Sequence, residues 1–466
     1  MIAELLFDAA ERFGDRVAVA DRDERLTYRQ LADRVRETGI PGAPYRVGLM
    51  AENSVAYVCA YFSVLRSGAI PFLIDYNFGP RELGVIAVDC GLDVVVHDGR
   101  DVTGEARGTV GGLRVTALTP PQDAPRPLPD TAVCRFTSGS TGKPNCIEFS
   151  GDAVVSAARN WANGTGLTAD DRIACFAALS NGLAFNTSLL AAFLTGAALH
   201  LDRGLPTGGR LARTLRDVGA TRLVGFPALY ESLLRRPDPR PAVGGLRVAI
   251  SSGAPLDDES GARFARLTGV PISNYYGVAE AGPLTFPTGD VTGGLGSPLP
   301  GVRLVAGTAG ASAEIRVRSE SMGSRYLNAP GMFEARLDDQ GYYRTGDEGF
   351  LTDGALYLSG RTDRMINVAG RKVDPIEVAG VLGQADGVRE CVVFEAAGQH
   401  GEPVVAAVVV GDGLDLGALR LRCSAELAGY KVPGFLLAVR EIPRNGIGKP
   451  ALPALRRLVE QQAVTT

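Results

Sequence analysis

The segment from Thr137 to Pro144 contains the residue types that bind phosphate. It reads Thr-Ser-Gly-Ser-Thr-Gly-Lys-Pro and follows an apolar strand expected over residues 132–136. Small residues let backbone N–H groups approach an anion closely, hydroxyls add donors, and a lysine adds charge. A Walker A loop is excluded, because Gly139 and Gly142 are too close together and Pro144 stands where Ser or Thr should bind magnesium. The pattern predicts a phosphate-binding loop of another kind, with an ordinary surface turn as the alternative.

Lysine is rare in this chain, which draws attention to each position where it occurs. Only four of the 48 basic residues are lysines: Lys143, Lys372, Lys431 and Lys449. A lysine is a compact point charge, whereas an arginine is a planar fork, so the two are not interchangeable. Lys143 in the phosphate-like segment and Lys449 in the Gly-flanked run 445–449 have a clear physical reason to be point charges. The other two have no assigned mechanism.

Composition and charge exclude several functions. The 466 residues carry a net charge of −4, which argues against general electrostatic binding to nucleic acid or to an anionic membrane. The seven cysteines form no CxxC pair and the three histidines are isolated, so a disulfide framework, a zinc site and histidine-based catalysis are not expected. The N-terminus lacks a signal-peptide pattern, and the longest apolar stretch is too short to span a bilayer. A reduced cytoplasmic protein is expected.

An α/β scaffold must position these residues. Apolar strands expected at residues 45–49, 94–96, 223–226 and 246–250 alternate with helices, one of them over residues 54–67, which is typical of parallel α/β layers. Between residues 301 and 358, short alternating strands with many glycines predict an antiparallel sheet or a small β-barrel. A compact α+β unit is expected after residue 360, with helices near 375–382 and 416–427 and strands at 391–394 and 404–410.

An ordered set of motifs runs through nearly the whole chain. The motifs are Leu26-Thr27-Tyr28 with Leu31, Leu65 to Ala69 with Ile74-Asp75, Thr137 to Pro144, Tyr275 to Glu280, Tyr343 to Asp347, Gly360 to Asp363, Gly370 to Val373, and Pro443 to Lys449. Together they resemble the acyl-adenylate-forming (AMP-binding) superfamily, which contains acyl-CoA synthetases, aryl acid ligases and peptide-synthetase adenylation domains. The resemblance implies an N-terminal domain, residues 1–360, that binds ATP and a carboxylate. It also implies a small mobile C-terminal domain, residues 361–466, with a hinge at Asp363.

The resemblance also implies roles for individual residues. The nucleotide-binding set would be Thr137, Ser138, Gly139, Ser140, Thr141, Gly142, Lys143, Gly253, Ala254, Tyr275, Tyr276, Gly277, Asp347, Arg361 and Lys449. Within it, Tyr276 would stack on adenine and Asp347 and Arg361 would bind the ribose. Glu280 would hold the magnesium ion that bridges the phosphates. The catalytic residues would be Lys449, Glu280 and Thr137.

Lys449 has a role that the chemistry itself explains. In the implied reaction a carboxylate attacks the α-phosphorus of ATP, so two anions meet while charge shifts toward departing pyrophosphate. A compact cation that touches both groups stabilises this transition state. A solvated surface lysine is the alternative interpretation.

Three positions depart from the family pattern. Ala279 stands where threonine is usual, Asn367 where many relatives have lysine, and Asn181 where acyl and aryl acid ligases commonly have histidine. The predicted substrate pocket consists of Asn181, Phe185, Asn186, Phe226, Ser252, Gly277 and Val278. The segment 185–188 resembles an amino-acid-binding motif, but Asn186 is neutral and cannot pair with an α-ammonium group. A non-amino aryl or short acyl acid is therefore expected; Asn181 and Asn186 could equally cap loops.

The sequence predicts an ATP-dependent carboxylate ligase that uses ATP and Mg²⁺. It would form an acyl-adenylate and transfer the acyl group to a thiol, either of CoA or of the pantetheine arm of a separate carrier protein. The alternatives are an adenylate-forming amide synthetase and an amino-acid adenylation enzyme. A phosphotransferase or a non-catalytic nucleotide-binding module fits the motifs less well, because Walker spacing is missing while Lys449, Glu280 and Asp347 are all present.

Overall fold

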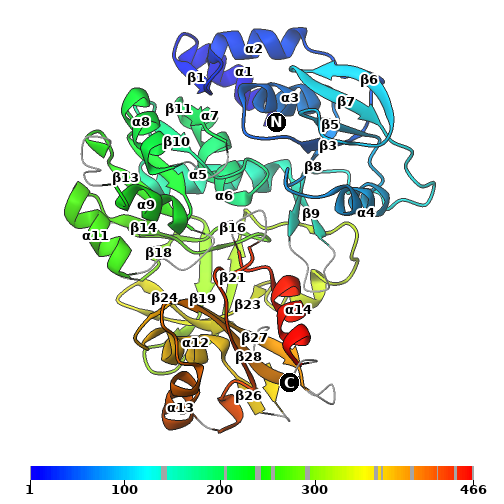
Figure 1. Cartoon of the computed structure of the whole chain (residues 1–466). Coiled ribbons are helices and arrows are strands. Elements are labelled where there is room, and N and C mark those ends of the chain that lie inside the picture. The colour runs from blue at the N-terminus through cyan, green and yellow to red at the C-terminus, as the bar shows by residue number, and fades with distance from the viewer. Residues whose placement is uncertain are drawn as a thin grey trace. The chain divides into compact units, whose positions relative to one another are not determined.

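The computed structural model has a mixed α/β fold with a larger N-terminal and a smaller C-terminal part, as predicted (Figure 1). It describes residues 2–137, 144–203, 207–236, 243–252, 258–288, 294–361, 366–368, 371–398, 403–427, 429–444 and 449–463. The chain divides into two compact units. Unit 1 contains residues 1–305, 316–345 and 351–357, and unit 2 contains residues 306–315, 346–350 and 358–466. The domain boundary after residue 360 remains a prediction.

An eight-stranded sheet forms one layer of unit 1. Its order is β22 (Arg325–Tyr326), β9 (Asn145–Ser150), β8 (Thr131–Thr137), β4 (Ile70–Leu73), β3 (Arg46–Met50), β5 (Val94–His97), β7 (Leu113–Ala117) and β6 (Glu105–Val110). The central strands β8, β4, β3 and β5 are parallel, and the outer pairs are antiparallel. All four residues of β5 are buried, and the first three are valines, as expected for a parallel strand that is covered on both faces.

A seven-stranded sheet forms the second layer. Its order is β14 (Ile272–Asn274), β13 (Val248–Ser251), β12 (Arg222–Gly225), β10 (Arg172–Cys175), β11 (Ala198–Leu201), β1 (Val17–Ala20) and β2 (Arg25–Thr27). The strands from β14 to β1 are parallel. The strands expected at 45–49, 94–96, 223–226 and 246–250 are thus confirmed, with small shifts at their ends.

Helices connect and cover these strands. They are α1 (Ile2–Phe13), α2 (Tyr28–Glu37), α3 (Val55–Arg66), α4 (Pro80–Cys90), α5 (Gly151–Thr165), α6 (Gly182–Ala184), η1 (Phe185–Leu190), α7 (Ala191–Thr195), α8 (Gly208–Val218), α9 (Pro227–Leu234) and α11 (Asp258–Thr268). Ser54 caps α3 by accepting a hydrogen bond from the Tyr57 amide. Within the described ranges, no helix is both long and apolar enough to cross a membrane.

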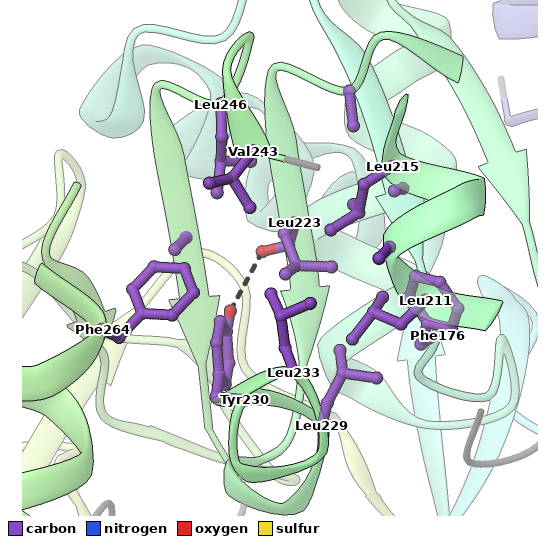
Figure 2. Close-up of a cluster of buried hydrophobic side chains, with 14 of the residues drawn as sticks. Phe176, Leu211, Leu215, Leu223, Leu229, Tyr230, Leu233, Val243, Leu246 and Phe264 are labelled. Carbon is purple, nitrogen blue, oxygen red and sulfur yellow. Dashed lines mark hydrogen bonds between the residues drawn. The ribbon is translucent and has the colours of Figure 1, made fainter. Parts of the chain in front are cut away.

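A hydrophobic core lies between one face of the second sheet and the helices α8, α9 and α11, which pack against β12 and β13 (Figure 2). Leu211, Leu223 and Leu233 are fully buried there. The buried Tyr230 hydroxyl lies 2.6 Å from the Ile250 carbonyl and 3.3 Å from the Leu223 carbonyl, to which it can donate. A phenol that has such backbone acceptors can be buried without leaving its polar end unpaired.

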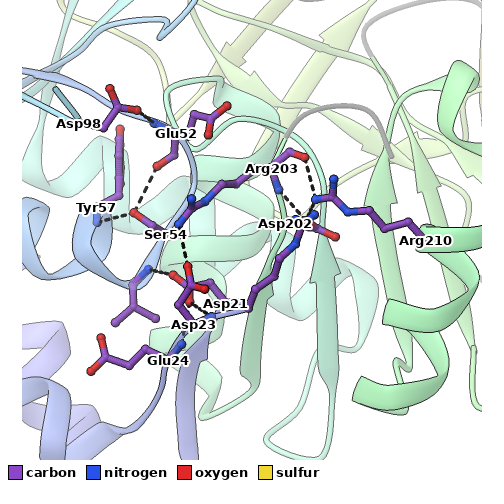
Figure 3. A network of polar contacts seen from close by, with 12 residues as sticks. Asp21, Asp23, Glu24, Glu52, Ser54, Tyr57, Asp98, Asp202, Arg203 and Arg210 are labelled. Atoms are coloured by element: carbon purple, nitrogen blue, oxygen red, sulfur yellow. Dashed lines mark hydrogen bonds and ion pairs between the residues drawn. The ribbon is translucent and has the colours of Figure 1, made fainter. Parts of the chain in front are cut away.

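A polar network holds the β1–β2 turn against α3 and the end of β11 (Figure 3). Asp21 accepts a 2.8 Å hydrogen bond from the Val55 amide at the start of α3. Asp202, which is 3% exposed, accepts from Arg22 and Arg210. Nearby, the Asn53 side chain bonds the Ala177 carbonyl and the Leu179 amide, both at 2.8 Å. These contacts fix the chain that leads into the predicted substrate pocket.

The segment from residue 301 onward changes to short strands. A five-stranded sheet contains β19 (Val302–Val305), β21 (Ala313–Ser319), β23 (Tyr343–Thr352), β20 (Gly307–Thr308) and β24 (Ala355–Arg361). Shorter elements of this region are β17 (Thr285–Phe286), β18 (Ser297–Pro298) and η2 (Glu334–Arg336). Strands β19 and β21 pair antiparallel, in agreement with the alternating pattern of the sequence.

The C-terminal part of unit 2 is a small α+β structure. A sheet of β27 (Val388–Ala397), β28 (Pro403–Gly411) and β29 (Phe435–Ala438) packs with α12 (Pro375–Gly383), α13 (Leu416–Glu426) and α14 (Leu452–Ala463). A separate pair is formed by β25 (Ile366–Val368) and β26 (Arg371–Val373), and η4 covers Gly429–Lys431. The expected helices and strands of this unit are confirmed at nearly their predicted positions.

Candidate functional site

The predicted phosphate loop connects two antiparallel strands. Thr137 ends β8 and pairs with Asn145 at the start of β9. A Walker A loop instead leads from a strand into a helix, so this connection agrees with the spacing argument against one. Residues Ser138, Gly139, Ser140, Thr141, Gly142 and Lys143 lie outside the described residues. Their phosphate-binding role remains a prediction.

The Tyr275–Glu280 motif forms a tight hairpin. Strand β15 (Gly277–Val278) pairs antiparallel with β16 (Gly282–Pro283), which places Glu280 in the turn between them. A Cβ atom at Gly277 would lie 2.7 Å from the Gly282 carbonyl oxygen, so only glycine allows this approach. Gly282 itself has a φ of +75°. The hairpin geometry therefore explains both glycines and holds the carboxylate at a defined position.

The two tyrosines before the hairpin are buried. The Tyr275 ring packs 5.0 Å from the Trp161 ring, measured between centroids. The Tyr276 amide donates to the Thr285 hydroxyl, and its carbonyl accepts from the Thr285 amide. The backbone of the proposed adenine-stacking residue is thus fixed, while the stacking itself remains a prediction.

Glu280 is held by a buried phenol. Its Oε1 accepts a 2.7 Å hydrogen bond from the Tyr326 hydroxyl, which lies 3.2 Å from the Tyr343 hydroxyl. Burial, and then the negative charge of Glu280, raise the pKa of Tyr326, so this phenol stays protonated and donates. Across the described part of the chain, no three His, Cys, Asp or Glu side chains are grouped to hold a metal. A lone carboxylate fits Mg²⁺ that takes its other ligands from phosphates and water.

Asn181 and Asn186 have different environments. The Asn181 side chain caps α6, where its Oδ1 accepts a 2.9 Å hydrogen bond from the Leu183 amide. Asn186 lies in η1, a π-helical segment of the kind often found at functional sites, and is 2% exposed. Its Nδ2 has no hydrogen-bond partner among the described residues. The capping interpretation thus describes Asn181, whereas Asn186 has a donor available beside the buried Phe185.

Three predicted site residues follow neighbouring parallel strands. Phe226 follows β12, Ser252 follows β13 and Tyr275 follows β14. The carboxyl ends of parallel strands meet at one edge of a sheet, which is where ligands bind in open α/β folds. The Ser252 hydroxyl lies 3.4 Å from the Tyr275 carbonyl, so two of these loops are in contact. Gly253 and Ala254 lie outside the described residues.

The remaining predicted residues belong to unit 2. Asp347 lies in β23 and is 6% exposed, and Arg361 ends β24. Lys449 is exposed and precedes Pro450, which forms a β-bridge with Arg444. The hinge residue Asp363 and residues 445–448 are not among the described residues. The roles of all these side chains remain predictions.

The structure gives Lys431 a clear partner. Its Nζ donates to both carboxylate oxygens of Glu377, at 2.7 and 2.6 Å. The backbone of Lys372 in β26 lies opposite that of Asn367 in β25. The point charge at position 431 therefore has a structural explanation within unit 2.

Among the described residues, two histidines, His97 and His200, and one surface cavity lie outside the motifs. The buried His97 ring lies 2.9 Å from the Thr116 hydroxyl, and burial lowers its pKa. Burial also lowers the pKa of His200 to about 4, so both rings are neutral at pH 7. A cavity of about 510 Å³ is lined by Glu4, Asp8 and other residues of α1 and α5, and contains none of the predicted site residues.

Sequence reasoning missed Arg135. This residue lies within β8, is 5% exposed, and its Nη2 donates to the Ala279 carbonyl at 3.3 Å. Burial lowers the pKa of Arg135 to about 10, opposed by the charge of Glu280, so it remains a cation at neutral pH. An arginine inside an otherwise apolar strand was the available signal.

Comparisons with known proteins agree with these motifs. The family model for AMP-binding enzymes matches residues 6–327, and the model for the AMP-binding enzyme C-terminal domain matches residues 377–449. The chain is 27% identical to 3-hydroxybenzoate–CoA ligase of Aromatoleum sp. (strain CIB), over 97% of this chain and 95% of that protein. It is 29% identical to a salicylyl-CoA synthase / salicylate adenylyltransferase of Streptomyces sp., over 99% of this chain and 94% of that protein.

A solved structure has the same fold. ATP-bound MatB from Rhodopseudomonas palustris superimposes with a TM-score of 0.82 at 21% identity, covering 99% of this chain and all of that one. The family models together span most of the chain, including the Glu280 hairpin and Lys449. The chain therefore belongs to the AMP-binding enzyme family, with both the large domain and the C-terminal domain of that family.

Proposed function

We propose that this protein is an ATP-dependent carboxylate ligase. It converts an aryl or short acyl acid into an acyl-adenylate and pyrophosphate, and then transfers the acyl group to the thiol of CoA. The observation that carries the proposal is the Glu280 hairpin, in which a buried phenol holds one carboxylate beside the Tyr275–Tyr276 pair. Membership of the AMP-binding enzyme family and the activities of the two relatives named above support it.

The first step joins two anions. A carboxylate oxygen of the acid attacks the α-phosphorus, the bond from that phosphorus to the bridging oxygen breaks, and pyrophosphate leaves with the electron pair. Lys449 would contact the attacking carboxylate and the α-phosphate, and Thr137 would bind a phosphate oxygen. Tyr276 would orient the adenine, and Asp347 the ribose. Magnesium, when bound, would be held by Glu280 and neutralise phosphate charge.

The second step exchanges AMP for a thiol. The sulfur attacks the acyl carbonyl carbon, the bond from that carbon to the AMP oxygen breaks, and AMP leaves with the electron pair while the thiol proton passes to solvent. No side-chain nucleophile is needed, which accords with the neutral rings of His97 and His200. We propose CoA as the thiol. The pantetheine arm of a carrier protein and an amine acceptor are the outcomes that the experiment separates.

The reaction class is tested by a screen of carboxylic acids with ATP and Mg²⁺. We expect pyrophosphate release, or ATP–pyrophosphate exchange, with at least one benzoate or short acyl acid and not with amino acids. Adding CoA should then give an acyl-CoA detectable by mass spectrometry. Formation of ADP would instead identify a phosphotransferase, if an acceptor is phosphorylated, or an ATPase, if phosphate is released. No pyrophosphate release with benzoates, short acyl acids or amino acids would contradict the proposed substrate class.

Replacing Glu280 with glutamine tests the proposed metal ligand. The amide keeps the shape of the side chain but loses the charge, so we expect kcat/KM for ATP to fall by roughly 10–100-fold and the Mg²⁺ concentration needed for half-maximal rate to rise. Glu320→Gln is the matched control, because Glu320 is exposed and lines the separate surface cavity. An unchanged Mg²⁺ dependence in Glu280→Gln would remove Glu280 from the metal site.

A further inference from the structure

Arg135 is a buried cation, and no carboxylate of the described residues forms an ion pair with it. Its guanidinium carbon lies 4.2 Å from the Phe149 ring centroid and 5.6 Å from the Phe185 ring centroid. Its Nε has no hydrogen-bond partner among the described residues, and the one acceptor of its Nη groups there is the Ala279 carbonyl at 3.3 Å. An arginine carries five N–H donors, so burying it with a single acceptor is costly unless a ligand supplies more.

The residues around the Arg135 guanidinium leave room for it. A Cβ atom at Gly182 would lie 2.4 Å from Arg135 Nη1, so glycine at this position makes room for the side chain. Gly182 directly follows Asn181, and Phe185 begins η1 three residues later. Arg135 therefore lies against the turn that carries the predicted substrate pocket, and its Nη2 reaches the hairpin that carries Glu280.

Two more buried donors without a partner among the described residues belong to side chains that adjoin Phe185 and the hairpin, both of which Arg135 also contacts. Asn186 follows Phe185, is 2% exposed, and its Nδ2 lies 3.3 Å from the position of a Cβ at Gly282, on the same hairpin. The Tyr61 ring packs edge-on against Phe185, with centroids 5.6 Å apart, and its fully buried hydroxyl has no partner among the described residues. The donors come from β8, η1 and α3. A set of unpaired N–H and O–H groups with one positive charge suits an anionic or strongly accepting oxygen.

We propose that Arg135 is a specificity-determining residue that binds a second oxygen group on the acid substrate. This inference rests on the proposed function. It narrows the substrate class to acids that carry a hydroxyl or a second carboxylate in addition to the carboxylate that is adenylated. The guanidinium, Asn186 Nδ2 and Tyr61 hydroxyl supply donors to that group, and the faces of Phe149 and Phe185 keep the site dry.

The test compares acids that differ only in the second group. The pairs are propionate with malonate, and benzoate with 3-hydroxybenzoate and isophthalate. In the unaltered protein we expect kcat/KM for at least one substituted acid to exceed that of its plain counterpart by about 10–100-fold, since hydrogen bonds to a charged group have that strength. Arg135→Met should bring this ratio near one, mainly by raising KM for the substituted acid, with KM for ATP unchanged.

Two further variants separate recognition from folding. Arg135→Lys keeps the charge and should retain part of the preference, while Arg316→Met, which alters an arginine that pairs with Asp338, should leave it intact. If the protein prefers the unsubstituted acid of every pair, or if Arg135→Met lowers kcat/KM for all acids by the same factor, Arg135 is only a structural cation between two aromatic rings. Circular dichroism of each variant shows which ones fold.

A binding measurement distinguishes failure of this inference from failure of the proposed function. Trp161, the sole tryptophan of the chain, packs on Tyr275, so its fluorescence can report acids that bind at this edge. Malonate, 3-hydroxybenzoate and isophthalate are titrated into the protein without ATP, in parallel with calorimetry. Binding of one of them that weakens at least tenfold in Arg135→Met and is partly restored in Arg135→Lys supports the site even if no pyrophosphate is released. Pyrophosphate release without any such difference overturns the site but leaves the ligase intact.

Discussion

Replacing Lys449 with alanine is expected to slow acyl-adenylate formation by roughly 10²–10³-fold, the usual loss when one electrostatic group is removed from a transition state. Lys449 is exposed and stands at the end of the matched C-terminal domain, where a point charge can be presented to a ligand. The measurement is ATP–pyrophosphate exchange with the best acid of the screen. Thioester formation from a supplied acyl-adenylate should change far less, because the implied domain rotation moves this lysine away before the second step.

The chain offers a matched control in the same unit. Lys431 forms an ion pair with Glu377, and the structure gives it no role toward a ligand. Lys431→Ala should therefore keep the exchange rate within about twofold, since partly exposed ion pairs contribute little to stability. An unchanged adenylation rate in Lys449→Ala would contradict the mechanism and favour a nucleotide-binding module without catalysis.

Replacing Asp171 with alanine is expected to lower the free energy of unfolding by about 3–5 kcal/mol, because it leaves the buried charge of Arg222 without its carboxylate partner. Arg222 is 3% exposed, and its Nε lies 3.1 Å from Asp171 Oδ2. The Thr221 hydroxyl and Arg247 Nη2 also donate to Asp171, at 2.6 and 2.7 Å. Urea denaturation at pH 7, followed by circular dichroism, measures the change.

The contribution of the Asp171–Arg222 ion pair to the free energy of unfolding depends on pH. Burial opposes the charge of Asp171, but the Thr221 hydrogen bond and Arg222 outweigh burial and lower its pKa. The stabilisation is therefore fully present above the ordinary carboxyl pKa of about 3.9, and is lost as pH falls through the lower folded-state value.

The control for Asp171 is its neighbour in the chain. Asp170 is 88% exposed and pairs with Arg16 at the surface, so Asp170→Ala should change the free energy of unfolding by no more than about 0.5 kcal/mol. A loss below about 1 kcal/mol in Asp171→Ala would show that the buried arginine finds other partners.

The position of Asp171 links stability to the site. It precedes β10, while Thr221 precedes β12 and Arg247 precedes β13, so one carboxylate joins the amino ends of three parallel strands. Phe226 and Ser252 follow two of the same strands at their carboxyl ends. Loosening these strands should therefore disturb the predicted pocket, although Asp171 touches none of its residues.

The sequence by itself determined the elements and the family. Strands such as β5 and β12 and helices such as α3 and α12 lie where apolar runs and capping residues predict them, because these signals act between neighbours in the chain. The order of the motifs along the chain is enough to indicate the AMP-binding enzyme family without any tertiary contact.

Only the tertiary structure decided which side chains meet. Asn181 and Asn186 are equivalent in the sequence, yet Asn181 caps a helix, whereas Asn186 buries a donor that has no partner in the described part of the chain. Lys431 forms an ion pair with Glu377, which is 54 residues away in the chain. Arg135 donates to the carbonyl of Ala279, which is 144 residues away. Such partners depend on how layers pack, and no local pattern encodes that packing. The rare lysines, the predicted catalytic chemistry and an arginine within an apolar strand were visible in the sequence, whereas the position of Arg135 beside the pocket was not.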